Sequence, residues 1–162
     1  MEKTFRFDSL PENRAGLAAL PEAALTDPFA AAALTVAALC RYEADPAAAV
    51  DMLNFLKGPQ PLSTYETQFL RDRLGGKGYK PFSFFAGATP ANNYTPAAPF
   101  NITVRDNPYS YQDEGYAMLY LTSGGADSPR GVKLRKKGEQ WFLWEQFLLS
   151  DIRTPAKDDP WA

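Results

Sequence analysis

The sequence predicts an α+β fold in which N-terminal helices pack on a C-terminal antiparallel β-meander. Helical patterns occupy residues 26–75, and short alternating runs separated by turns occupy residues 101–149. Strands joined by such short turns pair with their neighbours in the antiparallel sense. The 162 residues are close to the commonest size of one domain, so we expect a single domain over residues 1–162.

Three helices are expected in the first half of the chain, over residues 28–42, 46–57 and 64–74. An Asp-Pro pair opens each of the first two. Aspartate caps a helix well, and proline suits its first position. The first helix is apolar on nearly all sides, which is typical of a buried helix.

The third helix begins with a capping-box pattern, Ser63-Thr64-Tyr65-Glu66, and we expect it to turn Tyr65, Phe69 and Leu70 inward. It stops before Gly75-Gly76-Lys77-Gly78. This run follows a helix rather than a strand, and Gly78 stands where a phosphate-binding loop has serine or threonine. We therefore interpret the run as a helix end followed by a turn.

Residues 1–25 and 76–100 show no clear period. Phe5 and Phe7 alternate with polar residues, a pattern that fits a short strand. The 76–100 segment carries six large aromatic residues, which a disordered linker would lack. We expect an ordered loop that packs on the rest of the chain, with a short helix near 82–86.

The second half predicts four strands and then a tail without a period. The strands are expected near residues 102–105, 115–122, 132–137 and 140–148, and the tail covers 150–162. Strand 115–122 is apolar on both faces, so we expect it at the centre of the sheet and covered on both sides. The last strand carries large rings on both faces.

Charge and rare residues narrow the classes of function. The net charge of −2 gives no overall attraction to nucleic acid or anionic membranes. The chain has no histidine and one cysteine, so the commonest general base and the commonest metal ligand are missing. We expect no metal, no cofactor and no catalytic residue, and the composition argues against an enzyme.

The expected location is the cytoplasm. The first ten residues lack the apolar stretch of a signal peptide, and no apolar run reaches the ~20 residues of a membrane span. The single Cys40 cannot form a disulfide within the chain. We therefore expect no membrane contact.

Candidate binding residues lie in the predicted strands and in the turns before the second and third of them. They are Tyr109, Tyr111, Tyr116, Tyr120, Arg130, Lys133, Arg135 and Trp144. Tyrosine and tryptophan are enriched where proteins contact ligands or partners, although core packing also explains them. The basic residues suit an anion, but a solvated strand face paired with Glu139 or Glu145 is the simpler interpretation.

Three stretches of the chain carry a resemblance: Gly58–Leu74, Gly87–Pro96 and Gly138–Arg153. They resemble an uncharacterised bacterial family, a domain of unknown function found mainly in anaerobic Gram-positive gut bacteria. The resemblance covers roughly residues 45–162 and implies no activity. The order of helices, meander, basic strand and Trp-bearing strand is also similar to NTF2-like folds, which enclose a pocket between sheet and helices.

The sequence leaves the function unknown and favours a non-enzymatic binding or protein-interaction module. Its partner would be another protein, or a second copy, on the face of the sheet. One alternative is a small NTF2-like enzyme or ligand carrier, with Tyr116, Tyr120 and Trp144 around a pocket and Glu145 as its base. Weak nucleic-acid binding through the basic strand is a third and less favoured hypothesis. The deciding question is what covers the second face of the sheet.

Overall fold

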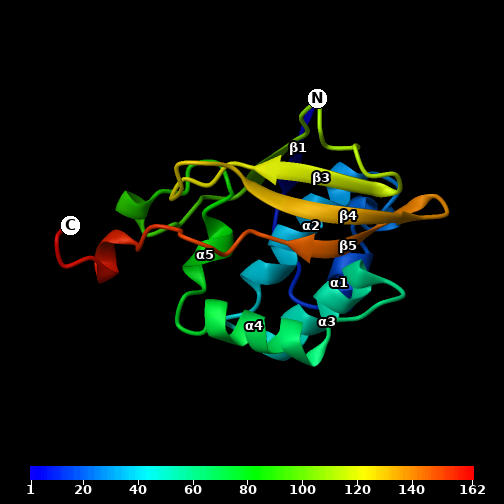
Figure 1. The fold of residues 1–162 in the computed structure, drawn as a ribbon. Coiled ribbons are helices and arrows are strands. Elements are labelled where there is room, and N and C mark those ends of the chain that lie inside the picture. Colours follow the sequence, from blue (N-terminus) through cyan, green and yellow to red (C-terminus); the bar gives the residue numbers. More distant parts are fainter.

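The computed structural model describes residues 1–162 and contains one five-stranded antiparallel sheet with helices on one of its faces (Figure 1). The strands lie side by side in chain order. They are β1 (Glu2–Phe7), β2 (Phe100–Arg105), β3 (Tyr116–Leu121), β4 (Arg130–Lys137) and β5 (Gln140–Gln146). The α+β class and the meander are confirmed. The N-terminal segment adds a strand, because β1 pairs with β2 along its whole length.

Five helices accompany the sheet: α1 (Arg14–Ala18), α2 (Pro28–Cys40), α3 (Pro46–Lys57), α4 (Thr64–Leu74) and α5 (Tyr79–Phe82). The three predicted helix starts are confirmed. The carboxylates of Asp27 and Asp45 accept hydrogen bonds from the first turns of α2 and α3, and Ser63 and Glu66 form a complete capping box. None of the helices has the length and apolar character needed to cross a bilayer.

Two helical details differ from the sequence prediction. Tyr65 is 77% exposed rather than turned inward, because α4 buries only Leu70 and Leu74 and leaves Tyr65 on its outer side. The short helix of the 76–100 segment is α5, which begins at Tyr79 and ends at Phe82, so it precedes the expected 82–86.

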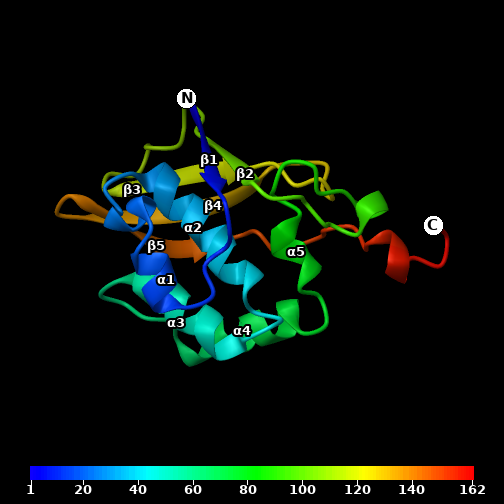
Figure 2. The ribbon, with the colours of Figure 1, turned by 180° about the vertical axis from the view of Figure 1, so that it is seen from behind.

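Helix α2 is the buried centre of the molecule. Every residue from Phe29 to Cys40 is buried, and the helix contacts all five strands as well as α3 and α5. Six of its thirteen residues are alanine. Because interhelical distance depends on side-chain size, alanine lets neighbours approach α2 closely on several sides. Figures 1 and 2 show the same helix behind β3–β5 in one view and in front of them in the other.

The two faces of the sheet differ in what packs against them. The inner face packs on α2, and its residues Leu119, Leu121 and Leu134 are at most 1% exposed. The outer face carries Tyr116, Met118 and Tyr120 on β3, which are half-buried, and no helix packs on it (Figure 1). Strand β3 is central, as predicted. The expectation that it is covered on both sides is wrong, because all the helices lie on one face.

The 75–100 loop closes one end of the molecule and leaves the outer face open. Its side chains Phe84, Phe85 and Tyr94 are buried, which confirms that it packs on the rest of the chain. Its backbone forms a hydrogen bond with the end of the sheet, where the Ala86 N–H donates to the Asn101 carbonyl of β2. The loop lies near the C-terminal end of β3 and near the C-terminal tail in Figure 1.

Replacing a buried alanine of α2 with a larger residue should destabilise the protein. Ala37 is fully buried, so Ala37→Leu should lower the free energy of unfolding by about 1–3 kcal/mol through overpacking. Ala47→Leu is the matched control, because Ala47 is exposed on α3, and it should change the value by less than about 0.5 kcal/mol. Urea unfolding measures both. Equal effects at the two positions would contradict the central role of α2.

Candidate functional site

Four of the eight predicted site residues meet on the outer face of the sheet. Tyr116 lies on β3, Lys133 and Arg135 on β4, and Trp144 on β5. The rings of Tyr116 and Trp144 pack edge to face, with centroids 5.8 Å apart and planes at 75°. We call these four residues the aromatic–cationic cluster.

The two cations of the cluster lie over its rings. Lys133 Nζ is 4.7 Å from the centroid of Tyr116, and Arg135 Cζ is 4.7 Å from that of Trp144. Arg135 Cζ is also 5.5 Å from the Tyr116 ring. Such contacts contribute about 0.5–1 kcal/mol at exposed sites. They hold the side chains of Lys133 and Arg135 in place on an open face.

Lys133 and Arg135 differ in their remaining partners. Lys133 Nζ lies 3.7 Å from the Asp113 carboxylate, and Lys133 stands opposite Glu145 in the strand register. The predicted pairing with Glu139 or Glu145 across the hairpin does not form as an ion pair, because Lys133 pairs with Asp113 although Glu145 stands opposite it. The guanidinium of Arg135 has no hydrogen bond or ion pair within the protein, so its contacts are the two rings. Its N–H donors remain available to a ligand.

A β-bulge sets the position of Trp144. The register passes from the pair Lys133–Glu145 directly to Leu134–Leu143, so Trp144 has no residue opposite it on β4. Bulges of this kind re-aim a side chain and increase local twist. Leu143 thereby keeps its place in the core while Trp144 lies over Arg135.

An apolar patch continues the outer face beside the cluster. Met118, Tyr120 and Phe147 surround Gly131 of β4. A Cβ at Gly131 would lie 3.0 Å from Met118 Sδ and 3.7 Å from each of the two rings. The missing side chain at this position lets the three groups close over the strand, and Phe147 remains 44% exposed.

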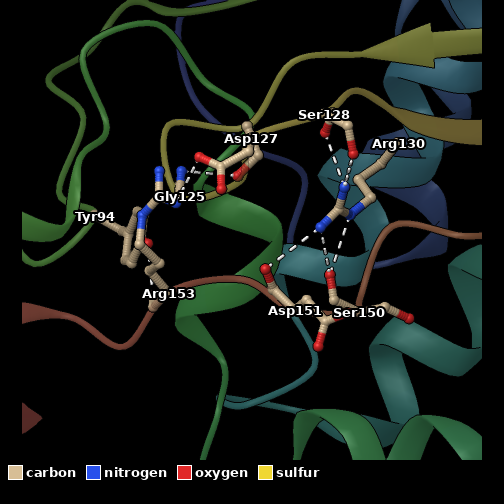
Figure 3. A network of polar contacts seen from close by, with 9 residues as sticks. Tyr94, Gly125, Asp127, Ser128, Arg130, Ser150, Asp151 and Arg153 are labelled. Carbon is tan, nitrogen blue, oxygen red and sulfur yellow. Dashed lines mark hydrogen bonds and ion pairs between the residues drawn. The ribbon is translucent and has the colours of Figure 1, made fainter.

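Arg130 is held by hydrogen bonds within the protein and so has a structural role. Its guanidinium donates to the carbonyls of Ser128, Ser150 and Asp151 and to the Ser128 hydroxyl, which ties the start of β4 to the tail (Figure 3). All these acceptors are neutral oxygens. The N–H donors of Arg130 are thus occupied within the protein, although the sequence places this residue in the same basic run as Arg135.

Tyr109 and Tyr111 lie in the connection between β2 and β3, apart from the cluster. The Tyr109 side chain is exposed, and the Tyr111 hydroxyl donates to the Asp106 carboxylate at 3.2 Å. Asp106 also accepts from the N-terminal ammonium at 2.8 Å. This hydrogen bond lowers the pKa of Asp106 despite the opposing effect of burial. Tyr111 therefore helps to anchor the chain start.

A groove along the free edge of β5 was not predicted from the sequence. One hollow of about 240 Å³ lies between α4 and β5, and ten of its fifteen lining residues are hydrophobic. A second hollow of about 300 Å³ lies beside the end of β4. Lys57, Leu143 and Trp144 line both hollows, so the two adjoin. We call them together the edge groove.

Lys57 is the charged residue buried in the wall of this groove. Its side chain is 4% exposed, and its Nζ donates to Glu66 Oε2 at 3.0 Å and to the Trp144 carbonyl at 3.1 Å. The sequence contains a signal for the burial of Lys57. Lys57 follows the apolar stripe of α3 that contains Met52, Leu53 and Leu56, a stripe that is buried here.

Glu66 joins the groove to the cap of α4. One carboxylate oxygen accepts from the Ser63 backbone N–H at 3.1 Å, and the other binds Lys57. Burial opposes ionisation of this carboxyl, but the Ser63 hydrogen bond and the Lys57 ammonium outweigh it and lower the pKa of Glu66. The Glu66 carboxyl is thus ionised at neutral pH.

The comparison with family models decides the relationship of the chain. The model of a domain of unknown function, DUF6935, matches residues 9–156. The chain belongs to the DUF6935 family. The match begins well before residue 45, where the sequence resemblance began, and so includes α1 and α2. Neither a curated protein nor a solved structure matches the chain.

The similarity of this DUF6935 domain to NTF2-like folds stays a prediction. Helix α2 occupies the space between the sheet and the other helices, and the inner-face residues Leu119 and Leu134 are fully buried there. The edge groove lies elsewhere, at the outer edge of the sheet. Glu145, the proposed base of the enzymatic alternative, is exposed.

A second buried lysine lies away from the groove in the DUF6935 domain. Lys80 Nζ donates to the Leu149 carbonyl at 3.0 Å. Burial lowers the pKa of Lys80, and the positive charges of Lys77 and Arg73 add to this effect. This contact ties α5 to the segment after β5.

No three His, Cys, Asp or Glu side chains lie close enough together to hold a metal ion.

The ion pair in the groove should give a pH-dependent share of stability. Glu66→Gln keeps a side chain suited to the capping box but removes the charge opposite Lys57, so we expect a loss of about 1–3 kcal/mol in the free energy of unfolding at pH 7. Because the folded-state pKa of Glu66 is lowered, its stabilisation is present above the unfolded pKa of ~4.3 and disappears as the pH falls through the folded value.

Urea unfolding of the wild type and Glu66→Gln from pH 7 down to pH 3 measures this dependence. The difference between the two proteins should shrink with falling pH. Glu114→Gln is the control, because Glu114 is exposed and makes no ion pair, and it should have no such effect. A difference independent of pH would show that charge is not the cause.

Proposed function

We propose that this protein is a non-enzymatic binding module whose outer sheet face docks a partner protein. The observation that carries this proposal is Arg135. Its guanidinium is held over Trp144 and Tyr116, yet it has no acceptor within the protein. Arg, Trp and Tyr are the residue types that most often supply the binding energy of protein interfaces.

The neighbouring surface defines the chemistry of the partner. Arg135 would pair with a carboxylate, because its fork of N–H donors matches that group. The apolar patch of Met118, Tyr120 and Phe147 would receive an apolar side chain of the same partner. The matching surface is therefore a segment that carries Asp or Glu beside a large apolar residue.

Charge balance favours a protein over a nucleic acid. Lys133 is already neutralised in part by Asp113 and stands opposite Glu145. Strong phosphate binding requires a longer track of uncompensated cations than Arg135, Lys136 and Lys137 provide at the end of β4, because Lys133 before them is paired with Asp113. We also place the module in the cytoplasm, since its lone thiol, Cys40, is buried and free.

Selection from a random peptide library tests the proposal. Peptides enriched on the wild-type protein should carry acidic residues next to apolar ones. Arg135→Gln and Trp144→Leu should each weaken binding of an enriched peptide at least about tenfold, the effect of a typical interface anchor. Fluorescence anisotropy with the labelled peptide measures the affinities.

Arg6→Gln is the matched control, because Arg6 is an exposed arginine on β1 paired only with Asp8. It should leave the affinity unchanged. Binding that Arg135→Gln and Trp144→Leu do not alter would refute the docking role of this face. If sedimentation shows a dimer that Arg135→Gln dissociates, the partner is a second copy of the chain.

A further inference from the structure

We infer that the edge groove, which adjoins the docking face, is a binding site for a small amphiphilic monoanion, a carboxylate with an apolar chain of several carbons. Ligand sites are usually concave and mostly apolar, with a few polar groups that fix orientation. The groove has this composition, with an apolar hollow on one side of Lys57 and a basic one on the other.

The apolar hollow sets the size of the chain. It has a volume of about 240 Å³ and is bounded by Leu62, Phe69 and Leu70 on the helix side and by Phe147 and Leu149 on the strand side. The hollow therefore accommodates an alkyl chain of several carbons.

The basic hollow sets the charge of the head group. Arg135, Lys136 and Lys137 line it together with Lys57, and its lining contains no Asp or Glu. None of the first three forms an ion pair within the protein. The nearest carboxylates of the groove, Glu66 and Glu145, line the apolar hollow instead. An anionic head beside this lysine-rich end has matching charge.

Lys57 marks where the head would lie. Its ammonium has three hydrogens, and the protein accepts two of them, at Glu66 and at the Trp144 carbonyl. The side chain is 96% buried, so little of it faces solvent. Because Lys57 lines both hollows, a carboxylate at their junction would lie near its ammonium and beside Arg135 and Lys136 while the chain enters the apolar side.

The edge of β5 is closed to the main competing occupant, an added β-strand. An incoming strand needs a row of free backbone groups. Here the Trp141 N–H already donates to the Leu25 carbonyl, and the Trp144 carbonyl already accepts from Lys57. The groove thus offers hollows and charge but no continuous backbone edge, which suits a small ligand.

Tryptophan fluorescence of the full chain tests this inference with decanoate as the probe, used far below its micelle concentration. In a Trp141→Phe, Trp161→Phe background, Trp144 is the sole reporter and lines both hollows. We expect a saturable change with a Kd below about 1 mM. Decanol should bind at least tenfold more weakly, and acetate should not bind.

Two groove variants separate the head from the chain. Lys136→Gln combined with Lys137→Gln removes two unpaired charges of the basic hollow and should reduce the preference for decanoate over decanol. Ser150→Phe, at an exposed position on the rim, should obstruct the hollow and weaken both ligands. Lys157→Met, a remote exposed lysine, should change neither affinity. Circular dichroism confirms that each variant is folded.

Three results would overturn the inference: no saturable response of Trp144, equal affinity for decanoate and decanol in the wild type, or a preference that the removal of Lys136 and Lys137 leaves unchanged. An acidic–apolar peptide from the library that binds the groove while decanoate does not would assign the site to a peptide. The groove shares Arg135, Trp144 and Phe147 with the docking face, whereas Met118 and Tyr120 belong to the docking face alone. Tyr120→Ala should therefore weaken the library peptide and leave decanoate binding unchanged, which distinguishes failure of one proposal from failure of the other.

Discussion

The complete burial of α2 is the constraint on which the rest of the structure depends. A helix that contacts five strands and two other helices needs small side chains, and the six alanines of α2 provide them. Its one polar side chain, Thr35, donates back to the Ala31 carbonyl and so is not left unsatisfied. With α2 in place, the inner face of the sheet is filled.

This arrangement determines where chemistry can occur. Since the interior between sheet and helices is occupied, polar and aromatic groups available to a ligand lie on the outer face and along the edge of β5. The aromatic–cationic cluster and the edge groove are neighbours for this reason. Trp144 belongs to both, because the β-bulge leaves it beside Arg135 and above the end of α3.

Arginines of similar sequence context have different roles because of what surrounds them. Arg130 meets backbone carbonyls of the tail, while Arg153 pairs with Asp127 and its carbonyl accepts from Tyr94 (Figure 3). These contacts fasten the 75–100 loop, the β3–β4 turn and the tail to one another. The Arg135 guanidinium contacts only the rings of Tyr116 and Trp144, so its N–H donors remain free to bind a ligand.

The sequence by itself determined the α+β class, the three capped helices and the strand order of the meander, because caps, turns and periodicity act between residues close in the chain. It also singled out Tyr116, Lys133, Arg135 and Trp144. Only the tertiary structure decided that these four meet, that Tyr65 is exposed and that Lys57 finds Glu66 beside a groove. Those outcomes depend on which distant segments pack together, and above all on the helices gathering on one face and leaving the other open.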